Sequence, residues 1–244
     1  MARGAYHLYW CINIIQTMKY IGITGKRGSG RETFAWLLGK TLQLSNKITY
    51  TEYQDLFKQW TDDVKKSKDC IGSNNYYVLE SFGGIILDSI RLTIPSLYEL
   101  NLSQGSEDLN RKFDIETLTV DSGSATVGEF IILYADKITK SNFGKRFWVN
   151  IAEQAAHRKE NDPFSTEQFV IYWDVKTDEE VEYIKGHNGV FIQISCPERL
   201  RSGGYNTIKS TAPDHKIRLH KDFVDDCQQI WDLAHSLLES DFLD

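Results

Sequence analysis

The stretch that decides the fold is residues 19–38, which read KYIGITGKRGSGRETFAWLL. The β-branched run from Tyr20 to Thr24 predicts a short buried strand. A glycine-rich turn follows, and apolar residues at Phe34, Leu37 and Leu38 then indicate a helix. Strand, glycine-rich turn and helix form the setting of a phosphate-binding loop, because backbone N–H groups and the helix N-terminus both attract anions.

The loop matches the pattern G-x-x-x-x-G-K-[ST] only in part. Gly25 and Gly30 have the required spacing, but Arg31 stands in the lysine position and Glu32 in the Ser/Thr position. A glycine-rich turn that binds no nucleotide is therefore the alternative interpretation. The candidate nucleotide-binding residues are Gly25, Lys26, Arg27, Gly28, Ser29, Gly30, Arg31, Glu32 and Thr33.

The composition is that of an ordinary globular protein, with 41% hydrophobic and 25% charged residues in a chain of 244. A net charge of −6 argues against a general nucleic-acid or membrane-surface binder. The four cysteines are scattered and form no C-x-x-C pair, which argues against a zinc or disulfide framework. Reduced thiols in the cytoplasm are the default expectation.

Residues 1–17 stand apart from the rest of the chain. They are mildly apolar, too short to span a membrane and without a small-residue cleavage site. Met18 directly precedes the first strand, so we interpret 1–17 as an N-terminal extension of doubtful role, with an edge strand or short helix as the rival. No repeat or linker divides 18–244, which we expect to form a single domain.

Strands and helices are expected to alternate along the chain. The strands are expected at 20–24, 76–79, 169–174 and 190–195, and the helices at 34–44, 50–60, 81–92, 126–139, 147–157, 179–185 and 225–239. Residues 62–69 look like a charged surface and 99–124 like a long loop. This order predicts an α/β fold, a parallel sheet flanked by helices on both faces, with ligands at the carboxyl ends of the strands.

Several separated stretches resemble one family, in the same order along the chain. Residues 25–33 resemble G-x-[KR]-x-S-G-K-D-[TF], and 81–87 resemble S-F-A-x-P-[LI]-K. Residues 142–149 are similar to N-F-x-x-x-[YF]-W-V, residues 174–180 to D-V-R-x-x-x-E, and Asp214-His215 to a later D-x-H or P-H element. The family is the phage-type deoxynucleoside monophosphate kinases, and animal phosphomevalonate kinases are distantly similar in the loop. The likeness spans about 18–240.

The resemblance implies a three-layer P-loop kinase fold and a role in nucleotide metabolism. The expected reaction moves the γ-phosphoryl group of ATP, with Mg²⁺, to a (deoxy)nucleoside monophosphate, giving ADP and the (d)NDP. Small-molecule nucleotides are then the partners, without nucleic acid or membrane, and a homodimer stays open. The expected location is the cytoplasm, which is the host cytoplasm if the chain is viral.

Four residues are expected to act in catalysis. Arg31 is the candidate cation for the β- and γ-phosphates, and Asp174 the acid for Mg²⁺ or the acceptor. Lys176 is expected at the acceptor or transferring phosphate, and Lys140 in a basic cluster over ATP that also contains Lys137, Lys145 and Arg146. Arg199 and Arg201 are further candidates for a lid or an adenine site. Glu32 is a second candidate metal ligand. Each residue has an alternative interpretation. Arg31 could be a surface arginine, and Asp174 could cap the turn after its strand. Lys140 could belong to a solvated basic face, and Glu32 could be an acid that stabilises the helix dipole.

The chain also departs from the family pattern. Arginine replaces lysine at position 31, and Leu87, Gly128 and Lys176 replace a lysine and two arginines. An arginine keeps the charge but lacks the compact ammonium of lysine, so such changes weaken phosphoryl transfer. The second hypothesis is therefore a catalytically degenerate relative that binds nucleotide or plays a structural role, and the third is a kinase acting on a mevalonate-type phosphate.

Overall fold

The computed structural model describes residues 18–66, 72–94, 97, 100, 112–113, 125–160, 166, 168–199, 208 and 210–239. The interpretation of 1–17 as an extension lies outside the described residues. So does most of the long loop expected at 99–124.

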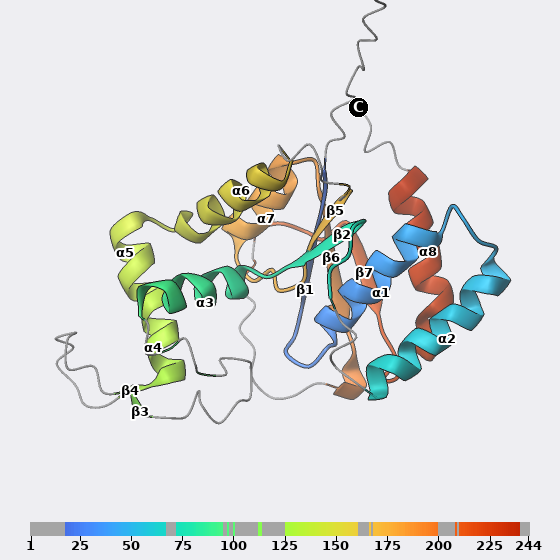
Figure 1. Cartoon of the computed structure of the whole chain (residues 1–244), viewed down its shortest axis with the longest axis horizontal. Helices are drawn as coiled ribbons and strands as arrows, with labels where there is room; N and C mark the ends of the chain where they lie inside the picture. Colours follow the sequence, from blue (N-terminus) through green and yellow to red (C-terminus); the bar gives the residue numbers. More distant parts are fainter. Residues whose placement is uncertain are drawn as a thin grey trace, which may run out of the picture.

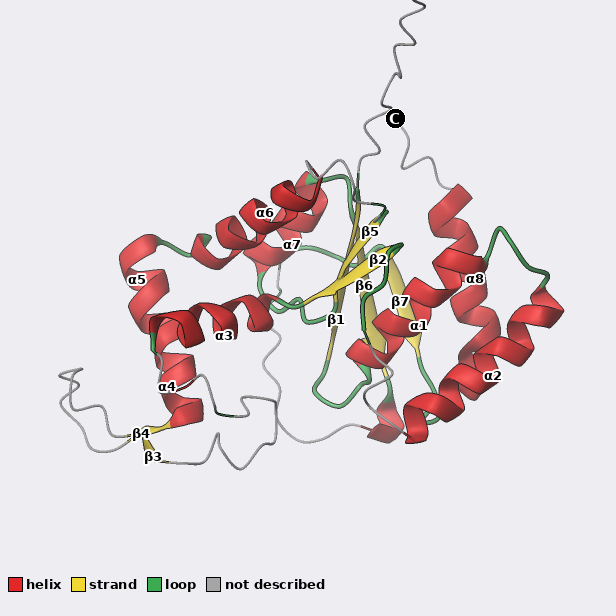
Figure 2. Cartoon of the chain, viewed as in Figure 1, coloured by secondary structure: helices red, strands yellow, loops and turns green. Residues whose placement is uncertain are grey.

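A five-stranded sheet of wholly parallel strands forms the centre of the molecule (Figures 1 and 2). Its order is β2-β5-β1-β6-β7, with β1 in the middle. The bounds are β1 Lys19–Gly25, β2 Tyr77–Glu80, β5 Phe169–Tyr172, β6 Val190–Ser195 and β7 His215–Arg218. The predicted parallel sheet is confirmed.

Strand β7 has no counterpart among the predicted strands. Its four residues alternate between half-buried and exposed positions, and Ile217 is the sole apolar one. An edge strand with one covered face needs little hydrophobic sequence, because pairing with β6 supplies its backbone bonds. The tertiary pairing, rather than any local pattern, makes this segment a strand.

Helices cover both faces of the sheet, so the predicted three-layer α/β architecture is confirmed. Helices α1 (Arg31–Leu44), α2 (Tyr50–Lys66) and α8 (Cys227–Glu239) pack on one side (Figure 1). Helices α6 (Phe147–Glu160) and α7 (Asp178–Gly186) pack on the other. Helix α2 extends six residues past its expected end at position 60, into the charged run.

Each face of the sheet has its own hydrophobic core. On the α1 side, Phe34, Leu37 and Leu38 are fully buried against β-strand residues and α8. On the α7 side, Val181 and Ile184 are fully buried among residues of α6 and the sheet. At about 25 cal/mol per Å² of apolar surface removed from water, these two layers supply most of the stabilisation.

A helical segment projects from the sheet beside β2. It contains α3 (Phe82–Thr93), α4 (Val127–Leu133), a π-helix η4 (Tyr134–Thr139) and α5 (Lys140–Phe143), and has a small core of its own (Figure 1). The short strands β3 (Lys112–Phe113) and β4 (Ala125–Thr126) pair antiparallel before α4. The single helix expected at 126–139 is thus divided, because its second half adopts the wider π turn.

The connections of the sheet create a ligand-binding position at its carboxyl edge. After β1 the chain enters α1 on one face, whereas after the neighbouring strand β5 it enters α7 on the opposite face. Two adjacent strands whose connections diverge in this way leave a crevice at their carboxyl ends, where α/β proteins bind ligands. The loop after β1 and Asp174 after β5 both lie at this point.

Within the described residues, no helix has both the length and the apolar character needed to cross a bilayer.

Candidate functional site

The loop after β1 requires glycine at three positions. Gly28 and Gly30 have φ angles of 85° and 82°, the left-handed region that other residues adopt only with strain. A Cβ at Gly25 would lie 2.7 Å from the carbonyl oxygen of Ile194, so the loop passes directly against β6. Ser29 N donates to the Lys26 carbonyl at 3.1 Å and closes the turn.

The loop leads into a helix with no side-chain cap. Helix α1 starts after Gly30, and no side chain accepts from its first N–H groups. In contrast, Ser81, Thr126 and Thr177 cap the starts of α3, α4 and α7. Uncapped N–H groups at a helix start are donors for an anion from outside.

Ser29 gives a second sign of a ligand at this loop. Its side chain is fully buried, and its hydroxyl has no hydrogen-bond partner among the described residues. A buried polar atom without a partner costs about 1–3 kcal/mol, and such atoms are rare unless water, an ion or a ligand satisfies them. The loop therefore combines a helix start that has no side-chain cap with an unsatisfied hydroxyl.

Arg31 begins α1 and points into the acidic part of the crevice. Burial lowers the pKa of Arg31, while the negative charges of Asp174 and Glu180 act in the opposite direction. Asp174 follows β5 and Glu180 lies in α7, so both acids that act on the loop cation belong to the β5–α7 connection.

The carboxylate of Asp174 binds to the start of α3. Strand β5 ends at Tyr172, and the carboxylate of Asp174, 3% exposed, reaches across to the start of α3. Its Oδ1 accepts from Phe82 N at 2.8 Å; its Oδ2 accepts from Ser81 Oγ at 2.8 Å and Gly83 N at 2.9 Å. Asp174 therefore fastens the helical segment to the sheet rather than capping the turn after its own strand.

The donors around Asp174 bear on its expected metal role. Lys176 Nζ lies 3.4 Å from Oδ2, so this oxygen already has three partners. Direct coordination of Mg²⁺ would require at least Lys176 to leave, and the described residues contain no cluster of three or more metal-ligating side chains. Glu32 is exposed on the first turn of α1. Both metal assignments stay predictions, and the donor set does not fit direct ligation by Asp174.

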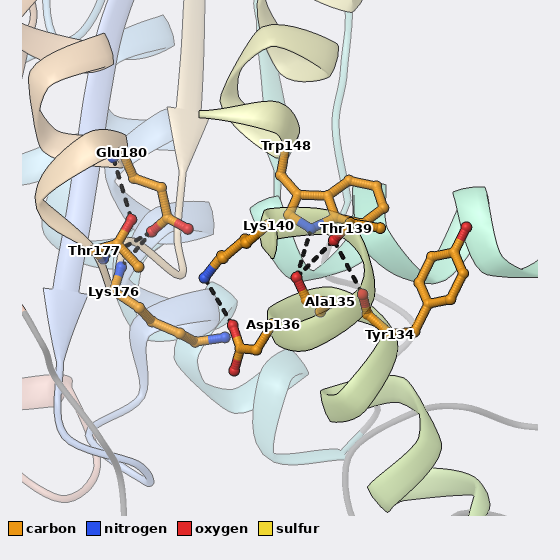
Figure 3. A network of polar contacts seen from close by, with 9 residues as sticks. All are labelled: Tyr134, Ala135, Asp136, Thr139, Lys140, Trp148, Lys176, Thr177 and Glu180. Carbon is orange, nitrogen blue, oxygen red and sulfur yellow. Dashed lines mark hydrogen bonds and ion pairs between the residues drawn. The ribbon is translucent and has the colours of Figure 1, made fainter. Parts of the chain in front are cut away.

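Lys176 and Lys140 come from opposite sides of the crevice. Figure 3 shows both side chains directed toward Asp136 of the π-helix. Lys140 Nζ pairs with Asp136 Oδ1 at 2.8 Å, and Lys176 reaches the region from the turn before α7. Each of the two lysines pairs with a different acid, Lys140 with Asp136 and Lys176 with Asp174 at 3.4 Å.

Hydrogen bonds from buried side chains stabilise the π-helix. The Thr139 hydroxyl donates to the carbonyls of Tyr134 at 3.0 Å and Ala135 at 2.7 Å. Trp148 Nε1 also donates to the Ala135 carbonyl, at 3.3 Å (Figure 3). Thr139 and Trp148 are 2% and 4% exposed, so Trp148 belongs to the core and does not stack on a base.

The other predicted residues lie at varied places. Lys26 and Arg27 are exposed on the loop, and Thr33 is half-buried in α1. Lys145 and Arg146 are exposed, and Arg146 pairs with Glu182 at 3.4 Å. The side chain of Lys137 and the whole of Arg201 lie outside the described residues.

The Asp214-His215 element lies away from the site. Asp214 accepts from Phe191 N at 2.7 Å, at the start of β6. His215 pairs with Ile192 in the same region. The element is therefore at the amino end of the sheet, opposite the loop.

Phe223 is a neighbour of the site that was not predicted from sequence. Phe223, itself at φ 62°, lies against Gly30, and the Arg199 guanidinium stacks over its ring at 4.5 Å. No local sequence pattern predicts that Phe223 lies at the loop, because only tertiary folding brings it there. Glu180 had a signal, since Thr177-Asp178-Glu179-Glu180 matches the capping-box pattern.

Glu180 is a half-buried acid that caps the start of α7 together with Thr177. Its Oε2 accepts from Lys176 N at 2.6 Å and Thr177 N at 3.1 Å (Figure 3). Burial raises the pKa of Glu180 to about 7 from an ordinary 4.5, and these two backbone bonds limit the rise. Between pH 4.5 and about 7, therefore, Glu180 keeps its proton in the folded protein, whereas it has lost the proton in the unfolded chain.

We expect Glu180→Gln to flatten the pH dependence of stability. The folded pKa is raised, so the contribution of Glu180 to stability is greatest below about pH 4.5 and is lost as the pH rises through about 7. Glutamine keeps an acceptor oxygen but does not ionise. Thermal unfolding between pH 5 and 8 should show the melting temperature of Glu180→Gln gaining on the native protein as pH rises. Glu179→Gln, one residue away, controls for lost charge; equal gains in both variants would refute the assignment.

Comparison with models of known protein families and with curated proteins found no match to this chain. Function is therefore inferred from the residues of the site.

Proposed function

We propose that this chain is a P-loop kinase that transfers the γ-phosphoryl group of ATP·Mg²⁺ to a (deoxy)nucleoside monophosphate. The observation that carries the proposal is the loop at 25–31. It joins left-handed glycines, an uncapped helix start and the unpartnered, fully buried Ser29 hydroxyl. Phosphate oxygens would satisfy all of these groups at once.

The donor triphosphate would lie along the loop with Arg31 at its reacting end. In the reaction the bond between the γ-phosphorus and the β–γ bridging oxygen breaks, and a phosphate oxygen of the acceptor bonds to that phosphorus. The protein contributes by positioning the groups and neutralising charge. The guanidinium of Arg31 suits this task because it is always charged and carries several donors.

The acceptor phosphate would bind between Lys176 and Lys140. These side chains come from the turn before α7 and from α5, and both face the same place (Figure 3). The helical segment that carries Lys140 is tied to the sheet by Asp174, so its approach to the loop would assemble donor and acceptor sites together. Mg²⁺ enters as part of the donor substrate, and no protein step depends on direct ligation by Asp174.

A second candidate is a relative that binds nucleotide without transferring phosphate. The ion pairs of both lysines favour it, since Lys140 pairs with Asp136 and Lys176 with Asp174. Arginine in place of the loop lysine favours it as well. A kinase acting on another small phosphate, of the mevalonate type, is the third candidate, because Lys176 and Lys140 recognise the phosphate and not the base.

The test is ADP formation by the purified protein with ATP, Mg²⁺ and each nucleoside and deoxynucleoside monophosphate in turn. We expect acceptor-dependent ADP release, reduced about 10²–10³-fold in kcat/KM by Arg31→Ala, because a positioned cation on the transferring group is lost. Lys58→Ala removes an exposed cation on α2 and should leave the rate unchanged.

Each outcome selects one candidate. ATP-dependent thermal stabilisation without turnover on any acceptor would replace the kinase by the binding protein. Turnover with phosphomevalonate, and not with nucleotides, would select the third candidate. The absence of both turnover and stabilisation would leave a glycine-rich turn with a structural role.

A further inference from the structure

We propose that Asp136 is a displaceable counter-ion that occupies the acceptor-phosphate position while no acceptor is bound. The inference rests on the proposed acceptor site between Lys140 and Lys176. The acceptor phosphate takes the place of the Asp136 carboxylate, so this residue sets the affinity of the site for phosphate.

The position of Asp136 is the first reason. Its Oδ1 lies 2.8 Å from Lys140 Nζ, and in Figure 3 the side chain of Lys176 points toward the same carboxylate. A carboxylate toward which two lysine side chains point stands where a bound phosphate would make its charged hydrogen bonds. Without Asp136, Lys140 would lose this carboxylate partner, whereas Lys176 would keep its contact with Asp174 at 3.4 Å.

The pair is weak enough to be exchanged. The side chains of Asp136 and Lys140 are 59% and 31% exposed and lie four residues apart along the helix. Exposed pairs at this spacing contribute only about 0.3–0.5 kcal/mol. A phosphate, with a charge near −2 and three acceptor oxygens, makes stronger bonds to two lysines than one carboxylate does.

The π-helix orients the side chains of Asp136 and Lys140. Asp136 lies inside η4 (Tyr134–Thr139), and Lys140 is the first residue after η4. The buried Thr139 hydroxyl and Trp148 Nε1 bind the carbonyls freed by the wider turn, as described above. Such turns occur mainly at functional sites, because they re-aim side chains at a cost in regular bonding.

Inorganic phosphate is the probe, and calorimetric titration at low salt is the measurement. We expect Asp136→Asn to bind phosphate about tenfold more tightly than the native protein, since the competing carboxylate is gone. The gain should persist in the Arg31→Ala background, which weakens the loop site, and disappear in the Lys140→Ala background. Asp88→Asn removes an acid from another exposed pair, with Arg91 at 3.7 Å, and controls for the change in net charge.

Two results would overturn the inference. One is a phosphate affinity of Asp136→Asn that is equal to or below that of the native protein; the other is an equal gain in Asp88→Asn. ATP-dependent stabilisation, measured alongside, separates the two proposals. If ATP stabilises the protein and Asp136→Asn leaves the phosphate affinity unchanged, the proposed kinase function is supported and the counter-ion role is refuted. If ATP has no effect but the Lys140-dependent gain is present, the anion site stands and the kinase falls.

Discussion

Gly30→Ala is expected to abolish ATP-dependent stabilisation and to lower the free energy of unfolding by about 3 kcal/mol. Two costs combine at this position. The φ angle of 82° is strained for a residue with a Cβ. The new atom would also lie 2.6 Å from Phe223 Cζ and 3.2 Å from Arg199 Nη1. Relief of this crowding would move the loop, and with it the N–H groups offered to phosphate. Urea unfolding and thermal shifts with ATP measure the two effects.

Gly144→Ala is the matched control for this prediction. Gly144 also has a positive φ, 90°, but no atom lies within 4 Å of the place where its Cβ would stand. It should show the backbone strain alone, about 1–2 kcal/mol, and normal ATP stabilisation. Phe223→Ala combined with Gly30→Ala should recover part of the lost stability. If Gly30→Ala unfolds at the same urea concentration as the native protein, Phe223 does not press on the loop.

Asp174→Ala is expected to lower the free energy of unfolding by about 3–5 kcal/mol. The carboxylate is 3% exposed, and its removal leaves Phe82 N, Gly83 N and the Ser81 hydroxyl without their acceptor. These donors lie at the start of α3, so the helical segment should lose its attachment first. Hydrogen exchange in α3 and urea unfolding of the whole chain measure the local and the global effect.

Asp174→Asn and Asp55→Asn complete the experiment. Asparagine keeps one acceptor oxygen at position 174, so an intermediate loss is expected, whereas the exposed Asp55 on α2 should be neutral. The series separates a structural role of Asp174, attachment of α3 to the sheet, from a role in metal binding. A pure metal ligand would lose ATP·Mg²⁺ effects while the free energy of unfolding in the absence of nucleotide stayed unchanged or rose; that result would contradict the role as an anchor.

The strands with apolar sequence could be predicted, and the strand without it could not. The sequences from Tyr20 to Thr24 and from Val190 to Ile192 are buried on both faces, so their apolar character reflects their place in the sheet. Strand β7 offers one apolar residue, Ile217, and becomes a strand only because β6 has a free edge. The same applies to η4, which reads as ordinary helix until Thr139 and Trp148 bind its carbonyls.

By itself, the sequence determined the central features of this protein: the glycine loop after a buried strand, the parallel sheet between two helical layers, and Arg31 at the start of α1. These follow from local sequence, since φ preferences, apolar periodicity and the order of strands and helices are all carried by neighbouring residues. Only the tertiary structure decided what Asp174, Asp136 and Phe223 contact. The partners of these three residues are distant in the chain or lie on a turn of unusual geometry, and hydrogen bonds and close contacts of that kind exist only once the sheet has formed.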